Sequence, residues 1–179
     1  MKIRLLKQND AYRMLEWMHD EDVTKDLAAD FKNKTIEDCR QFIDYAVNQC
    51  NDYKKCCNLH LAIVNDCDEY MGTVSLKDID RDSKNAEFAI TIRKDAMGKG
   101  YGIWGMKKII EIGLNNKDLG INDIYWCVSE VNKRAVKFYR KNDYIEIEPT
   151  SEMIDKYKEY SRETKLLWFK ISRENVGVK

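Results

Sequence analysis

Three alternating glycines, Gly98, Gly100 and Gly102, form the segment of this chain with the clearest chemical potential. They follow a strand-like run and precede an amphipathic helix-like run, and Lys99 lies between the first two. Glycine lets the backbone turn tightly and approach a ligand closely, and a helix start offers unpaired N–H groups and a partial positive charge. The segment therefore favours a pyrophosphate ligand over a merely flexible connection.

Two common phosphate-binding patterns do not fit this segment. A P-loop requires Ser or Thr after its Gly-Lys pair, whereas Gly98-Lys99 is followed by Gly100. A dinucleotide fingerprint opens the first βαβ unit, but here the third glycine comes one position early and the loop lies in the middle of the chain. A pyrophosphate is still the expected ligand, but in a loop that is neither a P-loop nor a dinucleotide fingerprint.

The elements that must position this loop follow from apolar periodicity. Strands are predicted at residues 2–7, 59–64, 70–77, 86–93, 121–129, 144–147 and 165–172. Helices are predicted after Asp10, from Thr35 to Cys50 with Thr35 and Asp38 as a capping box, after the glycines to about Asn115, and from Asn132. The polar residues 21–34, with Phe31, predict a mobile segment near a substrate. The order predicts an α/β (α+β) fold, a mixed sheet with helices on both faces.

Size and charge limit the classes of function. The 179 residues, 44% apolar and 35% charged, suit a single domain over residues 1–179. The formal net charge is zero, so we expect no nucleic-acid and no membrane partner. No run resembles a signal peptide or the roughly 20 apolar residues of a membrane span, and a cytoplasmic protein is expected.

The six cysteines suggest neither a disulfide framework nor a metal site. We expect reduced thiols, because the chain is not small and lacks a secretion signal. Cys56, Cys57, His60 and Cys67 are a poor zinc set, since adjacent cysteines chelate badly and no Cys-x-x-Cys occurs, so no metal is predicted. Cys127, in an apolar run, is expected to be a small buried hydrophobe.

Two ordered motifs resemble the GNAT N-acetyltransferase superfamily. Residues 97–102, Met-Gly-Lys-Gly-Tyr-Gly, are similar to its Gln/Arg-x-x-Gly-x-Gly/Ala loop, with Met97 at the Gln/Arg position. Residues 128–139 resemble its strand, Asn, and helix with Ala and Tyr. Asp143-Tyr144 stands where many members have Gly-Phe, so a different helix ending is expected.

The resemblance implies a fold and a cofactor. The fold would be a GNAT-like mixed, mostly antiparallel twisted sheet with helices on both faces and a splay between the central strands. The cofactor would be acetyl-CoA, with its pyrophosphate in the glycine loop, its pantetheine added as an extra strand, and Asn132 both capping its helix and contacting the cofactor arm. The residues expected to bind it are Ile90, Thr91, Ile92, Met97, Gly98, Lys99, Gly100, Tyr101, Gly102 and Asn132.

Two side chains are candidates for acid–base chemistry. Acetyl transfer to an amine needs a group that accepts the proton of the alkylammonium, and Glu87 on the strand before the loop is the candidate base. Its alternative role is that of a surface or salt-bridged glutamate. In the family a tyrosine matching Tyr139 protonates the leaving thiolate; the alternative is a core ring with its hydroxyl at the edge. Direct transfer in a ternary complex is expected.

The acceptor stays open at the level of sequence. Residues 86–88 and the region of Trp17, Asp20 and Val23 resemble the branch with ribosomal-protein N-terminal and spermidine acetyltransferases. Two classes of acceptor fit these residues. One is a small-molecule amine, namely a polyamine, an amino sugar or an antibiotic, and the other is a peptide N-terminus. The acidic residues between 20 and 30 would attract a cationic acceptor or form a solvated face.

Residues 150–164 suggest a lid or a solvated helix or loop. The resemblance is compatible with a homodimer, and the alternative function is a non-catalytic coenzyme A-binding sensor.

Overall fold

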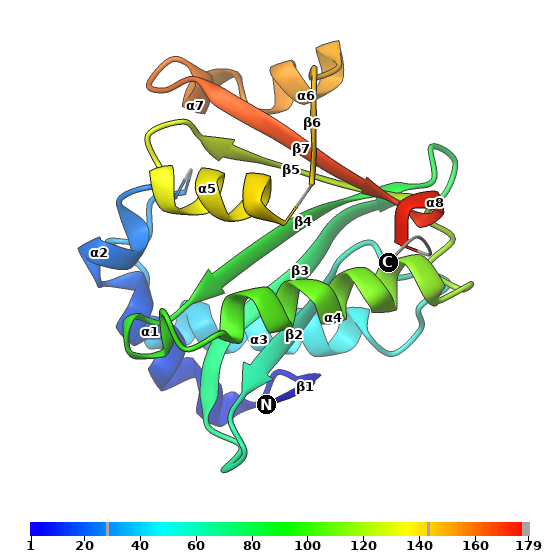
Figure 1. Cartoon of the computed structure of the whole chain (residues 1–179). Coiled ribbons are helices and arrows are strands. Elements are labelled where there is room, and N and C mark those ends of the chain that lie inside the picture. Colours follow the sequence, from blue (N-terminus) through cyan, green and yellow to red (C-terminus); the bar gives the residue numbers. More distant parts are fainter. Residues whose placement is uncertain (28, 143, 177–179) are drawn as a thin grey trace.

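A seven-stranded sheet forms the centre of the computed structural model, which describes residues 1–27, 29–142 and 144–176 (Figure 1). Its spatial order is β1-β2-β3-β4-β5-β7-β6, and every neighbouring pair is antiparallel except β4 and β5, which are parallel. The strands are β1 (Lys2–Leu5), β2 (Leu59–Val64), β3 (Tyr70–Asp80), β4 (Asn85–Ile92), β5 (Asp123–Ser129), β6 (Ile145–Ile147) and β7 (Leu166–Ser172). The mixed sheet expected from the sequence is confirmed.

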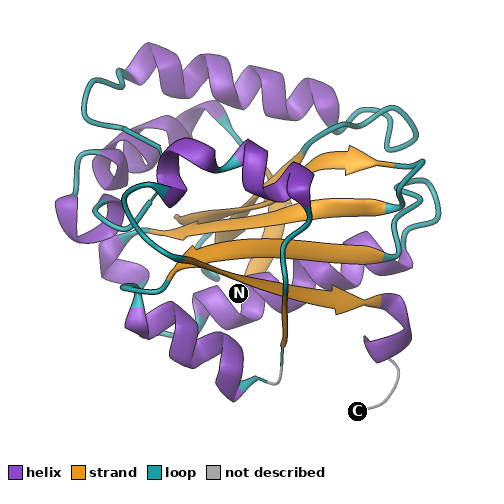
Figure 2. Cartoon of the chain, turned by 90° about the horizontal axis from the view of Figure 1, so that it is seen from above, coloured by secondary structure: helices purple, strands orange, loops and turns teal. Residues whose placement is uncertain are grey.

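Helices cover both faces of this sheet (Figure 2). They are α1 (Ala11–Met18), α2 (Glu21–Thr24), α3 (Ile36–Gln49), α4 (Tyr101–Asn115), α5 (Lys133–Lys141), α6 (Ser151–Lys156), α7 (Lys158–Ser161) and α8 (Arg173–Val176), with 3-10 turns η1 (Gln8–Asp10) and η2 (Lys94–Ala96). None of these described helices is long and apolar enough to cross a membrane.

Side-chain alternation divides the core between the two faces of the sheet. Ala86 and Phe88 of β4 belong to the larger cluster, in which α4 contributes Met106 and Ile109. The smaller cluster lies between the sheet and the helices α1 and α3, which supply Met14 and Ile43 among others. Since successive strand residues face opposite sides, Glu87 is directed away from the α4 face.

The helix starts that the sequence predicted are present. Thr35 caps α3, because its hydroxyl accepts from the N–H of Asp38 at 3.2 Å while the Asp38 carboxylate accepts from the N–H of Thr35 at 2.7 Å. This reciprocal pair satisfies two N–H groups at the start of α3. The C-terminal end of α5 lies at Lys141, and Asp143 lies outside the described residues.

One prediction for the N-terminal third is wrong. Residues 21–34 contribute to the core instead of forming only a mobile segment, since α2 buries Val23 and the ring of Phe31 lies 5.2 Å from that of Trp17 in an edge contact. The polar composition of the segment concealed these two apolar anchors. The bounds of β2 agree with the predicted ones, and the ends of the other strands differ by at most three residues, the largest difference being the extension of β3 to Asp80.

Candidate active site

The central strands separate at the site. β4 and β5 pair only at Asn85–Asp123, Ala86–Ile124 and Glu87–Tyr125, and the pairing stops at this last position. Residues 88–92 keep their partners on β3, while residues 126–129 keep theirs on β7. The backbone edges of β4 and β5 that face each other beyond Glu87 are therefore open to a strand-like ligand, the arrangement that Ile90, Thr91 and Ile92 require for their predicted role.

The glycine segment makes a left-handed turn from β4 into α4. Gly98 and Gly100 have φ angles of +75° and +87°, a region that glycine enters at little cost. Gly100 is the N-cap of α4, and no side chain caps the helix there. Because the first N–H groups of a helix lack intrahelical partners, this turn can present backbone donors to an anion.

Neither backbone strain nor packing requires the third glycine. The φ of Gly102 is outside the left-handed region, and a Cβ added there would lie 3.8 Å from its nearest neighbour, Cγ1 of Ile92. A Cβ on Gly98 would meet nothing within 4 Å. The loop thus has open space beside its backbone, and a closely approaching diphosphate fits that space.

Glu87 lies where the splay begins, with only 4% of its side chain exposed. Its carboxylate pairs with Nζ of Lys77 at 2.7 Å and accepts hydrogen bonds from the ammonium of Lys156 and the hydroxyl of Tyr157. Burial raises the pKa of the Glu87 carboxyl, but the two ammonium groups and the hydroxyl outweigh burial and lower this pKa below its ordinary value. Glu87 is therefore an ionised, buried, salt-bridged carboxylate at neutral pH.

Two residues of this cluster, Lys156 and Tyr157, escaped the sequence analysis. They lie in the polar residues 150–164, which form α6 and α7, and neither helix has a buried residue. Lys156 also contacts the carboxylate of Asp78, and the Tyr157 ring lies 5.6 Å from that of Trp168. Burial lowers the pKa of Lys156, but the carboxylates of Asp78 and Glu87 raise it above its ordinary value, so its ammonium stays charged. The only sequence signal was the position of the stretch between two strands.

Tyr139 belongs to an aromatic cluster on the α4 face of the sheet. Its ring centroid lies 5.3 Å from that of Trp126 and 5.2 Å from that of Phe169. Burial raises the pKa of the Tyr139 hydroxyl, and nearby Tyr144 and Cys127 act in the same direction. The ring packs in the core, and its neutral O–H keeps a proton to donate.

Cys127 lies on β5 near both candidate groups. Burial is the main cause that raises the pKa of its thiol to about 12, and the Glu87 carboxylate adds to this effect. Its charge state in turn influences the pKa of Tyr139. Because the thiol stays protonated at neutral pH, it is a poor nucleophile, as the sequence analysis expected. The side chain is only partly buried, so the expected full burial is wrong.

Asn132 caps α5 as predicted. Its side-chain oxygen accepts from the N–H of Ala135 at 3.1 Å. At the other side of the splay, Met97 ends the turn η2 and lies partly buried beside the smaller core. The guanidinium of Arg134, on the first turn of α5, donates to Sδ of Met97 at 3.3 Å. The start of α5 thus contacts the residue that begins the glycine loop.

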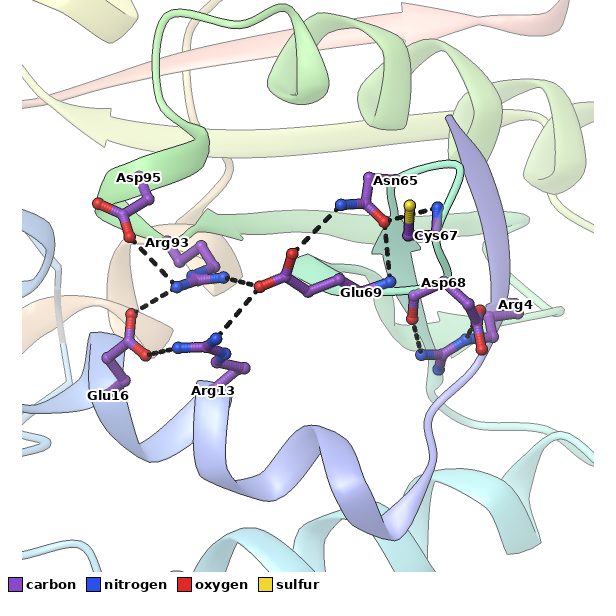
Figure 3. A network of polar contacts seen from close by, with 9 residues as sticks. All are labelled: Arg4, Arg13, Glu16, Asn65, Cys67, Asp68, Glu69, Arg93 and Asp95. Carbon is purple, nitrogen blue, oxygen red and sulfur yellow. Dashed lines mark hydrogen bonds and ion pairs between the residues drawn. The ribbon is translucent and has the colours of Figure 1, made fainter.

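A ring of ion pairs holds the end of β4 just before this loop (Figure 3). Arg93, with 4% of its side chain exposed, pairs with Glu16 of α1 at 2.8 Å and with Glu69 of the β2–β3 turn at 2.9 Å. Arg13 closes the ring by pairing with the same two carboxylates at 2.7 and 3.3 Å. A polar cleft of about 310 Å³ borders this ring and reaches Lys99.

The acidic residues between 20 and 30 are partly neutralised. Asp22 pairs with Lys94 at 2.8 Å, and Asp20 caps α2 by accepting from the N–H of Asp22 at 2.9 Å. Tyr160 of α7 donates to the backbone carbonyl of Asp26 at 3.0 Å. This segment therefore contacts the helices that cover Glu87, and two of its carboxylates serve local structure.

Comparisons with known proteins agree with this geometry. A family model described as acetyltransferase (GNAT) domain matches residues 1–145. The curated proteins give no match. Similar solved structures include a spermidine N-acetyltransferase from Vibrio cholerae in complex with CoA and spermine, at 15% identity, TM-score 0.75, and coverage of 97% of this chain and 95% of that chain. A probable acetyltransferase is similar at 18% identity and TM-score 0.74, with 97% and 93% covered.

Proposed function

The chain belongs to the GNAT acetyltransferase family, and we propose that it transfers the acetyl group of acetyl-CoA to the primary amine of a small molecule. The observation that carries this proposal is the separation of β4 and β5 directly after Glu87, with the glycine turn at the end of β4. The similar Vibrio cholerae enzyme is a spermidine acetyltransferase with bound spermine, which supports a small amine as acceptor. A peptide N-terminus is the second acceptor class that the sequence leaves open.

The residues of the splay fit the cofactor expected from the family. Acetyl-CoA, when bound, supplies the activated acetyl thioester. The backbone N–H groups of residues 98–102 would hold its diphosphate, and the open edge of Ile90, Thr91 and Ile92 would pair with its amide groups. An N–H of the same edge polarises the thioester carbonyl, a contact worth about 3 kcal/mol of activation energy. Met97, Lys99, Tyr101 and Asn132 complete the cofactor-binding residues of this proposal.

Glu87 accepts the proton of the acceptor in this proposal, after a change of partners. Its carboxylate has no free oxygen, since Lys77, Lys156 and Tyr157 contact it. An incoming alkylammonium has the same chemistry as the ammonium of Lys156 and can replace it. The alkylammonium keeps the number of cations beside Glu87 unchanged until its proton passes to the carboxylate. The products are a neutral amine and a protonated carboxyl group, and burial favours that uncharged carboxyl.

Tyr139 supplies the second proton. Its hydroxyl is neutral at working pH and lies on the helix that follows β5, so it can protonate the departing thiolate. We further propose that residues 1–179 act as one acetyltransferase domain in the cytoplasm. A homodimer is compatible with this proposal, because a similar spermidine acetyltransferase structure is described as dodecameric.

Thiol release from acetyl-CoA over a panel of amines tests the function. We expect turnover with at least one small primary amine, and a fall of about 100-fold in Glu87→Gln and in Tyr139→Phe with coenzyme A binding largely kept. Binding without turnover of any amine, unchanged in both variants, would instead support the non-catalytic sensor. Titration calorimetry with coenzyme A separates these outcomes from a loss of folding.

A further inference from the structure

The contact between Arg134 and Met97 joins the two sides of the splay at its phosphate end. Met97 precedes Gly98 directly, and Arg134 is the second residue of α5. The guanidinium Nη1 lies 3.3 Å from the thioether sulfur. Arg134 thus places a positive charge beside the start of the glycine loop, where the loop itself has the apolar side chain of Met97.

Arg134 is poorly matched with its present partner. A guanidinium offers five N–H donors in a plane, whereas a thioether sulfur is a weak acceptor. Among the described residues no carboxylate pairs with Arg134, while Arg140 on the same helix pairs with Glu146 at 2.9 Å. The Arg134 side chain is also exposed, so an anion can reach it without displacing a buried group.

We propose that Arg134 binds the diphosphate of coenzyme A and supplies the side-chain cation that Met97 cannot supply. This inference rests on the proposed function and names a further cofactor-binding residue, one that reaches the loop from α5. The planar guanidinium matches two phosphate oxygens at once, and such charge-assisted pairs are about twice as strong as neutral hydrogen bonds. The neutral thioether of Met97 leaves the guanidinium uncompensated until the phosphate arrives.

Titration calorimetry on the full chain tests this assignment. We expect Arg134→Met to weaken coenzyme A binding by about tenfold or more, and Arg134→Lys, which keeps the charge, to weaken it less. Lys141→Met is the matched control, because it removes the same charge two turns farther along α5, and its affinity should equal that of the unmodified chain. Circular dichroism and thermal melting confirm that each variant is folded.

Dephospho-coenzyme A, which lacks the 3′-phosphate but keeps the diphosphate, shows which phosphate group Arg134 contacts. If Arg134 binds the diphosphate, Arg134→Met loses the same factor for coenzyme A and for dephospho-coenzyme A. A loss confined to coenzyme A would assign Arg134 to the 3′-phosphate and overturn the proposal. Equal affinities of Arg134→Met and Lys141→Met would overturn it as well.

A second substitution provides a rescue. Met97→Arg placed in the Arg134→Met background should restore most of the lost affinity, because the cation then returns to the same spot from the loop side. Failure to restore it would count against a phosphate contact at this position. Absence of coenzyme A binding by the unmodified chain would instead contradict the proposed function itself, so the two failures are distinguishable.

Discussion

The two ends of β4 carry opposite buried charges. At its start, the Glu87 carboxylate is held by the ammonium groups of Lys77 and Lys156. Just beyond its end, the Arg93 guanidinium is held by the carboxylates of Glu16, Glu69 and Asp95. Each central side chain is only 4% exposed, so each would be costly to leave unpaired.

The partners differ in how firmly they are built into the fold. Those of Arg93 come from α1, the β2–β3 turn and η2, and Arg13 links two of them into a closed ring. Two of the three partners of Glu87 are Lys156, the last residue of α6, and Tyr157, between α6 and α7, and neither of these helices has a buried residue. The comparison indicates a fixed anchor for the glycine loop and an exchangeable cover over Glu87.

Replacing Arg93 should have the largest effect and would test the fixed anchor. Arg93→Met removes the charge-assisted hydrogen bonds of a buried guanidinium, while Arg13 still pairs with Glu16 and Glu69. We expect a loss of about 2 kcal/mol in the free energy of unfolding. Urea denaturation measures it. Arg140→Met, which breaks an exposed pair with Glu146, is the control and should cost less than about 1 kcal/mol. A similar small cost for both variants would contradict the anchor.

A methyl group at Gly102, which follows β4 in the first turn of α4, would show whether stability and coenzyme A affinity depend on this glycine in different ways. Gly102→Ala meets no atom closer than 3.8 Å and lies in the first turn of α4, so stability should stay equal or rise by up to about 1 kcal/mol. Coenzyme A affinity should change by less than about twofold, because the loop pattern of the family accepts Ala as well as Gly at this position. Thermal melting measures the stability and calorimetry the affinity, and a tenfold loss of affinity would contradict the assignment of Gly102 to this position of the pattern.

Removal of Lys156 would test the exchangeable cover. In Lys156→Met the acceptor no longer competes with an ammonium of the chain, so its KM should fall by about fivefold, equivalent to about 1 kcal/mol, while coenzyme A affinity stays the same. Steady-state kinetics with the best amine of the panel measure the change. Lys158→Met, in the adjacent α7, is the control. An unchanged or raised KM would show that Lys156 does not occupy the acceptor position.

Acid should remove the contribution of the Glu87 cluster, the smallest of the four effects. The folded-state pKa of Glu87 lies below its ordinary value of 4.5, so the unfolded chain binds the proton more readily. The stabilisation is therefore complete above pH 4.5 and decreases as the pH falls below that value through the folded pKa. The difference in Tm between the unmodified chain and Glu87→Gln, measured from pH 7 to pH 3.5, should shrink. A difference independent of pH would contradict this origin.

Local patterns allowed most of the fold to be predicted. The Thr35–Asp38 capping box, the cap by Asn132 and the glycine turn depend on neighbouring residues, and all three are present. Periodicity also located all seven strands, with small errors at their ends. These features are set by interactions between residues close in the chain, which a single sequence displays directly.

The partners of the central charges could not be predicted in the same way. Glu87 and Lys156 are 69 residues apart, and Glu16 and Arg93 are 77 apart. No periodicity marks such pairs, because only the strand order and the packing of α1 and α6 bring them together. For the same reason the interpretation of Glu87 as a salt-bridged residue could not be separated from that of a base. The structure confirms the salt-bridged carboxylate, and the role as a base stays a prediction.

The short ladder between β4 and β5 also affects how strongly the two parts of the sheet are held together. Within the sheet, three residue pairs connect β4 to β5, and the edge contact of Phe88 with Trp126, at 5.5 Å, is part of the larger core that supports them from one face. A ligand that hydrogen-bonds to the free edges of both β4 and β5 would connect these strands where they do not pair with each other. Its binding energy then becomes part of the folding energy, so protection of amide hydrogens in β5–β7 should follow the supply of coenzyme A.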